Sequence, residues 1–203
     1  IIIATGASSE LEVDLLIRKI SKINKRIILM QCNTNYTASE NNFGYINLNV
    51  LKLYKKKYPN IILGLSDHTL GNETVLGAVA LGARVIEKHF TDSNSRSGPD
   101  HLFSMNPKTW KQMVRSCRKL ESSLGDGRKK IEINELQSSI VQRRAIRANR
   151  HIKKGELIKK NDLINLRPWP KNSLSPYEFK KILKKRARRD IKFHEIINKK
   201  NTK

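Results

Sequence analysis

Hydrophobic residues in the first 124 positions form two alternating patterns: short continuous runs, and stretches with helical spacing. The runs lie at the start of the chain and at 26–32, 61–65 and 84–87, and a polar loop follows each run. The stretches at 10–22, 46–58, 72–82 and 106–124 have the length and apolar spacing of helices. Four consecutive βα units are therefore predicted. This order indicates a parallel sheet covered by helices, either doubly wound or part of a (β/α)8 barrel.

The pattern changes after residue 124. Residues 125–142 are charged and irregular, so a linker is predicted there. Beyond it, a short apolar run at 144–148, several turn signals and the rigid segment 167–170 are typical of a small β-rich domain, with a short helix at 175–184. A domain of about 60 residues buries little apolar surface, so a partner surface is expected to support it.

Two histidines follow neighbouring predicted strands. His68 comes after the third apolar run and His89 after the fourth. The carboxyl ends of parallel strands meet at one edge of a sheet, so the two imidazoles are expected to lie together. With Asp67, Glu87 and Asp100 nearby, they suit a divalent transition metal that keeps open positions for substrate. The alternative is that each histidine only hydrogen-bonds a neighbour at a strand end.

The composition excludes some classes of protein. With 203 residues, 38% of them hydrophobic, the chain can bury a core. Its longest apolar runs fall well short of the ~18 residues of a membrane span, and no signal-like leader opens it. Cys32 and Cys117 are too few for a disulfide framework, which favours a reducing cytoplasm.

The net charge of +23 is unevenly distributed. Residues 143–203 carry 21 basic and 5 acidic side chains, a net charge of +16, which leaves +7 for residues 1–142. A basic domain of this kind can bind nucleic acid through its phosphates. The lysines are interspersed with Asn and Ile, however, and no aromatic RNA motif or zinc finger accompanies them. A solvated basic surface is therefore favoured over a nucleic-acid site.

Four motifs occur in series along the chain: SDHTLG at 66–71, IEKHF at 86–90, GPDH at 98–101, and the set RRAI, KKGE and LRP between 143 and 168. In this order they resemble the sialic acid synthase family over essentially the whole chain. The resemblance implies the C-terminal half of a (β/α)8 TIM barrel, its last four βα units over 1–124, a linker over 125–142, and a small β-rich SAF (antifreeze-like) domain over 143–203. The front half of the barrel would be missing, so we expect an incomplete fragment without synthase activity of its own.

The resemblance also implies a reaction and its cofactor. Family members condense phosphoenolpyruvate with an N-acetylmannosamine-type sugar and release phosphate, as cytoplasmic, domain-swapped homodimers. His68 and His89 match the metal-binding histidines of the family, and the metal is expected to be Mn²⁺. The sequence does not specify which sugar is used, nor does it distinguish Mn²⁺ from Zn²⁺ or Mg²⁺.

Five further residues match family positions that bind substrate. Thr5 matches a phosphate contact, Ser66 a serine near phosphoenolpyruvate, and Tyr36 a tyrosine that contacts the sugar. Asp100 matches an aspartate that binds sugar hydroxyls, and Arg167 an arginine that reaches the other subunit of the dimer to hold the N-acetyl group. Four of them also have a simpler interpretation. Ser66 can be an ordinary strand-end hydroxyl, Tyr36 an aromatic at the rim, Asp100 a turn residue, and Arg167 a surface arginine in a basic domain.

The sequence departs from the family pattern at several positions. Ala4 replaces a serine, Thr34 stands where an asparagine is common, and Trp169 and Lys184 replace glycines. The lysines and glutamate of the front half of the barrel have no counterpart. The competing hypothesis is a non-catalytic, basic carbohydrate- or polyanion-binding module on a decayed barrel.

Overall fold

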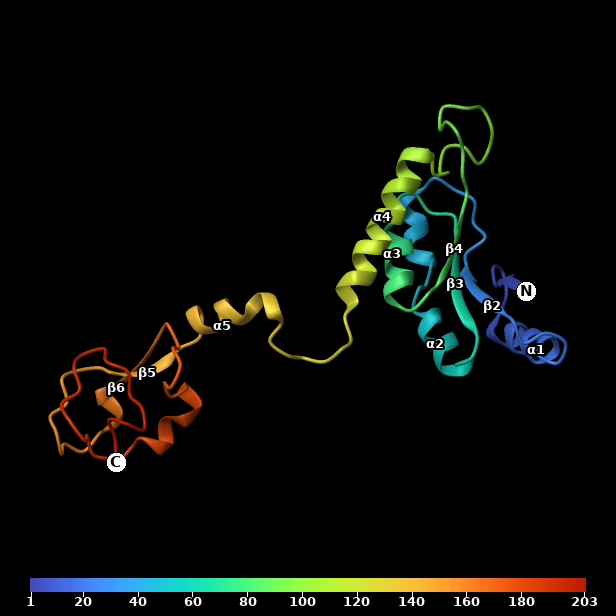
Figure 1. The fold of residues 1–203 in the computed structure, drawn as a ribbon. Coiled ribbons are helices and arrows are strands. Elements are labelled where there is room, and N and C mark those ends of the chain that lie inside the picture. The colour runs from blue at the N-terminus through green and yellow to red at the C-terminus, as the bar shows by residue number, and fades with distance from the viewer. The chain divides into compact units, whose positions relative to one another are not determined.

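The computed structural model describes residues 1–203 and divides into two compact units, Ile1–Gly127 and Arg128–Lys203. Each unit has its own hydrophobic core and is described by itself (Figure 1). No helix in either unit combines the length and the apolar character needed to cross a membrane.

The first unit alternates strands and helices around a four-stranded parallel sheet (Figure 1). The strands lie in the sheet in their order along the chain, and each pairs with the next. They are β1 (Ile2–Ala4), β2 (Ile28–Cys32), β3 (Ile62–Asp67) and β4 (Val85–Lys88), and the helices are α1 (Glu10–Ile20), α2 (Val50–Lys57), α3 (Glu73–Ala80) and α4 (Pro107–Leu124). The predicted series of four βα units is confirmed, and the sheet has the parallel order of half a barrel.

Capping residues set the start of α1 and both ends of α4. The Ser9 hydroxyl accepts from the backbone N–H of Glu12, and the Glu12 carboxylate accepts from the backbone N–H of Ser9, so α1 begins with a capping box. The side chain of Asn106 caps α4 in the same way, directly before Pro107. Gly125 ends α4 with a φ of 62°. The predicted bounds of this helix are therefore confirmed.

The segment between β2 and β3 differs from the single helix predicted at 46–58. A 3₁₀ helix, η1 (Glu40–Tyr45), precedes α2, and α2 begins only at Val50. Asn47 lies between them with a φ of 49°. This left-handed conformation cannot continue a right-handed helix, so the chain turns there before α2 starts.

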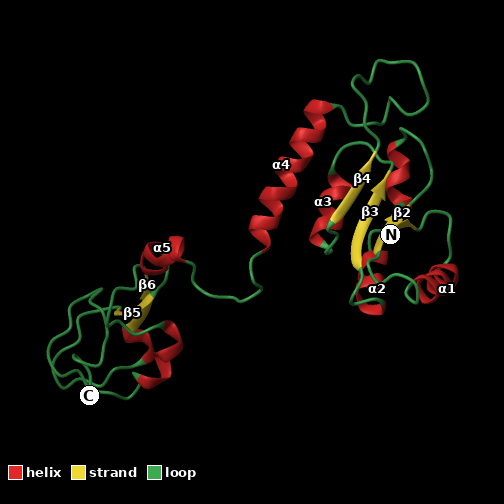
Figure 2. Ribbon diagram, turned by 45° about the vertical axis from the view of Figure 1, so that its right-hand side comes forward, coloured by secondary structure: helices red, strands yellow, loops and turns green.

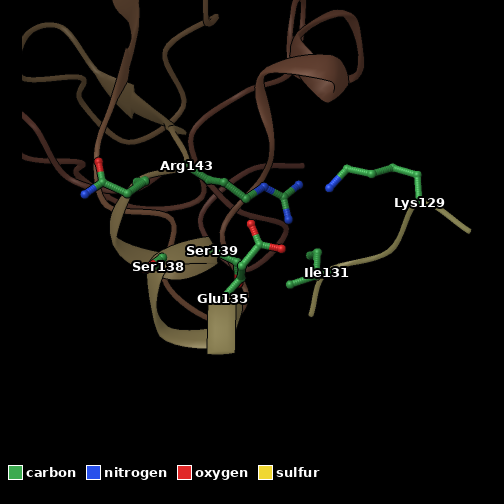
Figure 3. A pocket seen from close by; sticks show the side chains of 7 residues that line it. Lys129, Ile131, Glu135, Ser138, Ser139 and Arg143 are labelled. Carbon is green, nitrogen blue, oxygen red and sulfur yellow. The ribbon is translucent and has the colours of Figure 1, made fainter. Parts of the chain in front are cut away.

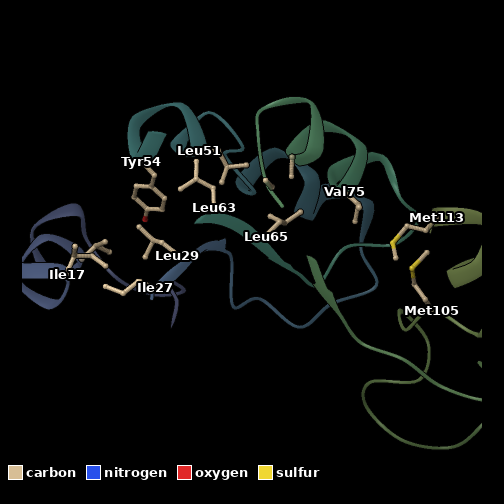
Figure 4. Packing of buried hydrophobic residues seen from close by; sticks show 13 residues of the cluster. Ile17, Ile27, Leu29, Leu51, Tyr54, Leu63, Leu65, Val75, Met105 and Met113 are labelled. Carbon is tan, nitrogen blue, oxygen red and sulfur yellow. The ribbon is translucent and has the colours of Figure 1, made fainter. Parts of the chain in front are cut away.

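The core of the first unit lies between the helices and one face of the sheet (Figure 4). Leu29 on β2 and Leu65 on β3 are fully buried, and they pack with Leu51 of α2 and Val75 of α3. Side chains alternate between the two faces of a strand. The residues next to these leucines therefore belong to the opposite face of the sheet.

That opposite face is closely packed at its centre and polar at its carboxyl end. Gly64 pairs with Met30 and Val85, and a Cβ added to it would lie 2.7 Å from the Val85 carbonyl oxygen and 2.8 Å from the Met30 Cγ. Only glycine fits there without displacing backbone. Two positions further along, on the same face, Cys32 pairs with Ser66, and Ser66 pairs with Glu87 on β4.

The second unit contains a two-stranded antiparallel sheet and many loops (Figure 2). Fully buried isoleucines on its strand and loops form the core, Ile146, Ile152, Ile158, Ile191 and Ile197 among them. Its elements are η2 (Ile133–Glu135), α5 (Leu136–Val141), β5 (Ala145–Ala148), η3 (Lys160–Asp162), β6 (Leu163–Leu166) and η4 (Pro176–Lys181).

Three features of this unit differ from the sequence-based expectation. The segment 125–142, expected to be an irregular linker, contains η2 and α5. Strand β6 was not predicted, because its four residues carry no clear alternation. The helix predicted at 175–184 is the 3₁₀ helix η4, and Lys184 follows it with a φ of 67°, a conformation that favours the glycine found there in the family.

A cavity of about 520 Å³ lies beside α5 (Figure 3). The side chains of Lys129, Glu135 and Arg143 line it, and their charged ends turn toward the same space. None of the residues predicted to bind substrate or metal borders this cavity.

Candidate active site

The two histidines converge at the carboxyl ends of β3 and β4. His68 directly follows β3 and His89 directly follows β4, and Asp67 pairs with Lys88 in the register just before them. Their ring centroids lie 5.1 Å apart, with 63° between the ring planes. The prediction that both imidazoles lie at one edge of the parallel sheet is therefore confirmed.

A backbone carbonyl orients His68. The Nδ1 atom of its ring lies 2.8 Å from the carbonyl oxygen of Asn33, in the loop that follows β2. A carbonyl can only accept, so this geometry assigns a proton to Nδ1, and in the neutral imidazole Nε2 then keeps its lone pair. Such a second hydrogen bond is how proteins orient histidines that bind metal ions.

Aspartate and aromatic side chains surround His89. Its Nδ1 atom lies 3.5 Å from Oδ2 of Asp100, whose side chain is half exposed. The ring of Phe103 lies 5.1 Å from the ring of His89, and the ring of Tyr36 lies 4.3 Å from that of His68 and 5.5 Å from that of His89. Tyr36 and Asp100, both predicted from the sequence, are thus brought to the histidine pair.

The loop between β4 and α4 carries Asp100 and Phe103 to the site. Met105 donates its backbone N–H to the carbonyl of His89 at 2.9 Å, and Thr91 donates to the carbonyl of Met105 at 2.9 Å. These two bonds close the base of the loop beside His89. A loop closed in this way returns its residues to the strand end from which it started.

A polar row lies below the histidines on the same face of the sheet. The Ser66 hydroxyl donates to Oε1 of Glu87 at 2.7 Å, and Ser66 is 3% exposed. Ser66 and His68 are two residues apart on one strand, as are Glu87 and His89, so both pairs point to the same side. Ser66 was predicted as a site residue, whereas Glu87 was recognised only as a neighbour of the histidines.

Cys32 lies beside Ser66 in the same row. Burial raises the pKa of its thiol above the ordinary range, an effect that a hydrogen bond with Ser66 partly offsets. We expect Cys32 to react with iodoacetamide much more slowly in the native chain than in chain unfolded by guanidinium, because both the thiolate population and access are reduced. Mass spectrometry of the alkylated peptide measures this. Equal rates in the two states would contradict the burial of Cys32.

Thr5 lies elsewhere than the resemblance implied. Its side chain is 5% exposed, donates to the carbonyl of Met30 at 2.9 Å and accepts from the hydroxyl of Tyr54 on α2 at 3.1 Å. Because Tyr54 belongs to the helix layer, the Thr5 hydroxyl faces that layer and is already paired. In this structure Thr5 packs between sheet and helix, and its role as a phosphate contact stays a prediction.

Asp67 also faces the helix layer. Its carboxylate accepts from Lys88 at 2.6 Å and from Thr74 of α3 at 2.7 Å. It is therefore unavailable to a metal at the histidine pair, contrary to its expected place near that metal. Lys88 contacts Asp67 on this helix side and therefore points away from the histidine pair.

Arg167 belongs to the second unit and is exposed. The neighbouring Trp169 donates its backbone N–H to the carbonyl of Ile140 at 2.8 Å, and the guanidinium of Arg143 lies 3.9 Å from its ring centroid. The tryptophan that replaces a family glycine thus ties this loop to α5. Within the first unit the candidate site is formed without Arg167.

Sequence reasoning missed Phe103, Asn33 and Cys32. Ser66 was predicted through the family resemblance, whereas alternation along the strand would have selected Glu87, two residues before His89. No comparable signal marks the carbonyl of Asn33 or the ring of Phe103, because both reach the site from loops.

The donor set fits a metal ion with open coordination positions. No group of three or more His, Cys, Asp or Glu side chains is arranged to hold a metal. The chain therefore offers two imidazoles, of which His68 is oriented with Nε2 free. Closed structural sites use four protein ligands, so this pair suits a site that substrate or water completes.

The fold and the site together define an α/β enzyme-like half-barrel with a histidine pair at the carboxyl ends of its strands. The chain belongs to the NeuB family, whose model matches residues 1–129. The resemblance inferred from the motifs is thereby confirmed for the family. The model does not extend over the predicted SAF domain.

Several curated relatives are named as sugar acid synthases. The chain is 34% identical to N,N'-diacetyllegionaminic acid synthase of Campylobacter jejuni, over 97% of this chain and 58% of the relative. It is 38% identical to N,N'-diacetyllegionaminic acid synthase of Legionella pneumophila, over 90% of this chain and 51% of the relative. Human N-acetylneuraminate-9-phosphate synthase is 32% identical, over 64% of this chain and 35% of the human protein. The chain spans little more than half the length of the bacterial relatives.

Solved structures show the same fold. A spore coat polysaccharide biosynthesis protein E from Chromobacterium violaceum matches all of this chain and 60% of its own, with a TM-score of 0.69 and 21% identity, a likeness of fold alone. An N-acetylneuraminic acid synthetase from Leptospira borgpetersenii matches 68% of this chain and 47% of its own, with a TM-score of 0.60 and 31% identity.

Proposed function

We propose that this chain contributes the metal-binding part of the active site of a nonulosonic acid synthase. The reaction would join carbon 3 of phosphoenolpyruvate to the aldehyde carbon of an N-acetylmannosamine-type sugar. Water would add to carbon 2, and the bond between carbon 2 and the phosphate oxygen would break to release phosphate. The observation that carries the proposal is the convergence of His68 and His89, whose ring centroids are 5.1 Å apart at the strand ends.

His68 and His89 would hold the metal, for which we propose Mn²⁺. When bound, such an ion supplies Lewis-acid polarisation of the aldehyde oxygen and a template for the reacting groups. The carbonyl of Asn33 would keep Nε2 of His68 directed to it. The imidazole and carboxylate donors nearby are compatible with Mn²⁺.

The remaining residues would bind and orient the substrates. Ser66 would contact phosphoenolpyruvate. Its hydroxyl proton now points to Glu87, so it must rotate to donate to an anionic ligand, which leaves the Glu87 carboxylate free to accept from water or a sugar hydroxyl. The half-exposed carboxylate of Asp100 would accept from sugar hydroxyls, and Tyr36 would cover the pair and exclude water.

Arg167 would complete the sugar site in a homodimer. It lies exposed on the loop before Trp169, and the tie between Trp169 and Ile140 limits the freedom of that loop. Its guanidinium would hold the N-acetyl oxygen of the sugar bound by the other subunit. This role rests on the family resemblance of the LRP turn.

A chimera tests the proposed function. Four parallel strands do not close a barrel, so we expect the 203-residue chain alone to form no product. We expect product once the N-terminal part of the Campylobacter jejuni relative is joined ahead of residue 1. Phosphate release and the mass of the sugar acid are measured with phosphoenolpyruvate, Mn²⁺ and several N-acetylmannosamine-type sugars.

The same chimera with His68→Ala is the matched control and should form no product. The proposal would be contradicted if the chimera folds, with circular dichroism like that of the relative, and binds both substrates but releases no phosphate. So would equal activity in the His68→Ala chimera.

A further inference from the structure

A buried ion pair lies directly behind the two histidines. Asp67 is the last residue of β3 and Lys88 the last residue of β4, and the two are partners in the sheet register. Lys88 Nζ lies 2.6 Å from Asp67 Oδ2, and their side chains are 1% and 0% exposed. Each partner immediately precedes one histidine along its strand. Because neighbouring side chains alternate between the two faces, the ion pair lies on the helix face of the sheet and the imidazoles lie on the opposite face.

The Asp67 carboxylate is saturated with hydrogen bonds from the segment that follows His68. Its Oδ1 accepts from the backbone N–H of Thr69 at 3.1 Å and from the Thr69 hydroxyl at 2.9 Å. Its Oδ2 accepts from the hydroxyl of Thr74, in the first turn of α3, at 2.7 Å. The residues on both sides of His68 are therefore tied to one carboxylate.

Lys88 extends the same network across the two strands. Its Nζ donates to the carbonyl of Thr69 at 2.7 Å as well as to Asp67. The ammonium thus links the end of β4 to the backbone just beyond His68. The network spans both strand ends and the start of α3, and every charged group in it is paired.

Stability alone does not account for such a pair. Replacing a buried ion pair by residues of similar volume without charge is often neutral or stabilising, since desolvation offsets the attraction between the charges. Position offers a better explanation. The pair fixes the two peptides from which the imidazoles project, and a histidine pair can share one ion only at a defined separation.

We propose that the Asp67–Lys88 pair positions His68 and His89 for shared metal binding. It acts from the opposite face of the sheet, through the backbone, and touches neither metal nor substrate. The proposal rests on the function proposed above, because it requires that the histidines bind a metal. The two can fail separately.

The test is Mn²⁺ binding to the full 203-residue chain, followed by the electron paramagnetic resonance signal of free Mn²⁺. The double variant Asp67→Asn/Lys88→Met removes both charges and keeps similar volumes, so the fold should persist. We expect its Mn²⁺ affinity to fall by about 10–100-fold, the usual effect of losing groups that orient metal ligands. The visible spectrum of bound Co²⁺ should also change, because the arrangement of the imidazoles changes.

Lys57→Met is the matched control. Lys57 pairs with Glu10 and Asp14 at 2.5 Å, between α2 and α1, and is not part of the Asp67 network. Its loss removes an ion pair from the same unit and should leave Mn²⁺ affinity and the Co²⁺ spectrum unchanged. Thr74→Val is a milder variant that removes one hydrogen bond to Asp67, and we expect a smaller loss of affinity in the same direction.

Each outcome decides the proposal. Unchanged affinity and spectrum in the folded double variant would overturn it, as would an equal loss in Lys57→Met. If circular dichroism shows that the double variant does not fold, Thr74→Val decides, and unchanged affinity there overturns the proposal. If the His68→Ala variant binds Mn²⁺ as tightly as the wild type, the proposed metal site is refuted, and the positioning role of the ion pair is refuted with it.

Discussion

Replacing His68 or His89 by alanine is expected to reduce Mn²⁺ affinity by at least about 100-fold, more than the loss of an orienting group costs. The reason is the donor set. The structure brings two imidazoles together, and no third protein group completes a cluster around them. In the proposed site each histidine would supply one of the two imidazole ligands, and a single remaining imidazole would not hold the ion at a fixed point.

Titration of Mn²⁺ against the chain, with the free ion measured by paramagnetic resonance, checks this expectation. His151→Ala is the matched control, since His151 lies in the second unit and is half exposed. The Mn²⁺ affinity of the His151→Ala variant should equal that of the wild type. If the single variants at His68 and His89 bind as the wild type does, any bound metal sits elsewhere and the proposed site is wrong.

Leu65→Ala is expected to destabilise the first unit by about 2–5 kcal/mol. Leu65 is fully buried at the centre of β3 and packs against the helix layer. Truncation removes three carbons from a position where sheet and helices meet, and the surrounding strands cannot collapse onto the cavity without losing their register. The loss is therefore expected in the upper part of the range for core leucines.

The two units can be followed separately in this experiment. Trp110 lies in the first unit and Trp169 in the second, and the chain has no other tryptophan. In a Trp169→Phe background, fluorescence during urea unfolding reports the first unit. Leu11→Ala is the control: Leu11 is 68% exposed on α1, so a change within about 0.5 kcal/mol is expected. Equal losses for the two leucines would contradict the packing described here.

Local patterns were sufficient to predict the order of the first unit. Continuous apolar runs mark strands that are buried in a parallel sheet, and helical spacing marks the segments that cover it. Asn106, Pro107 and Gly125 are cap residues in sequence, and α4 begins and ends at them. Prediction failed where a local signal was absent. No residue pattern predicted η1, or the left-handed conformation of Asn47 that separates η1 from α2.

Part of the candidate site follows from the sequence for the same reason. Parallel strands place their carboxyl ends at one edge, so His68 and His89 had to meet there if the strands were neighbours. Ser66 was assigned through resemblance to a family, and alternation along β3 puts it on the side of His68. Tyr36 and Asp100 were assigned through resemblance to a family, and the structure brings both to the histidine pair.

The sequence by itself therefore determined the series of βα units and the edge of the sheet at which the histidines lie, since both follow from periodicity within each segment. Only the tertiary structure decided which partner each polar side chain takes. Thr5 pairs with Tyr54 of α2, and Asp67 with Lys88 of β4, although both had been expected near substrate or metal. Such pairings depend on strand register and helix packing between residues far apart in the chain, which no local pattern encodes.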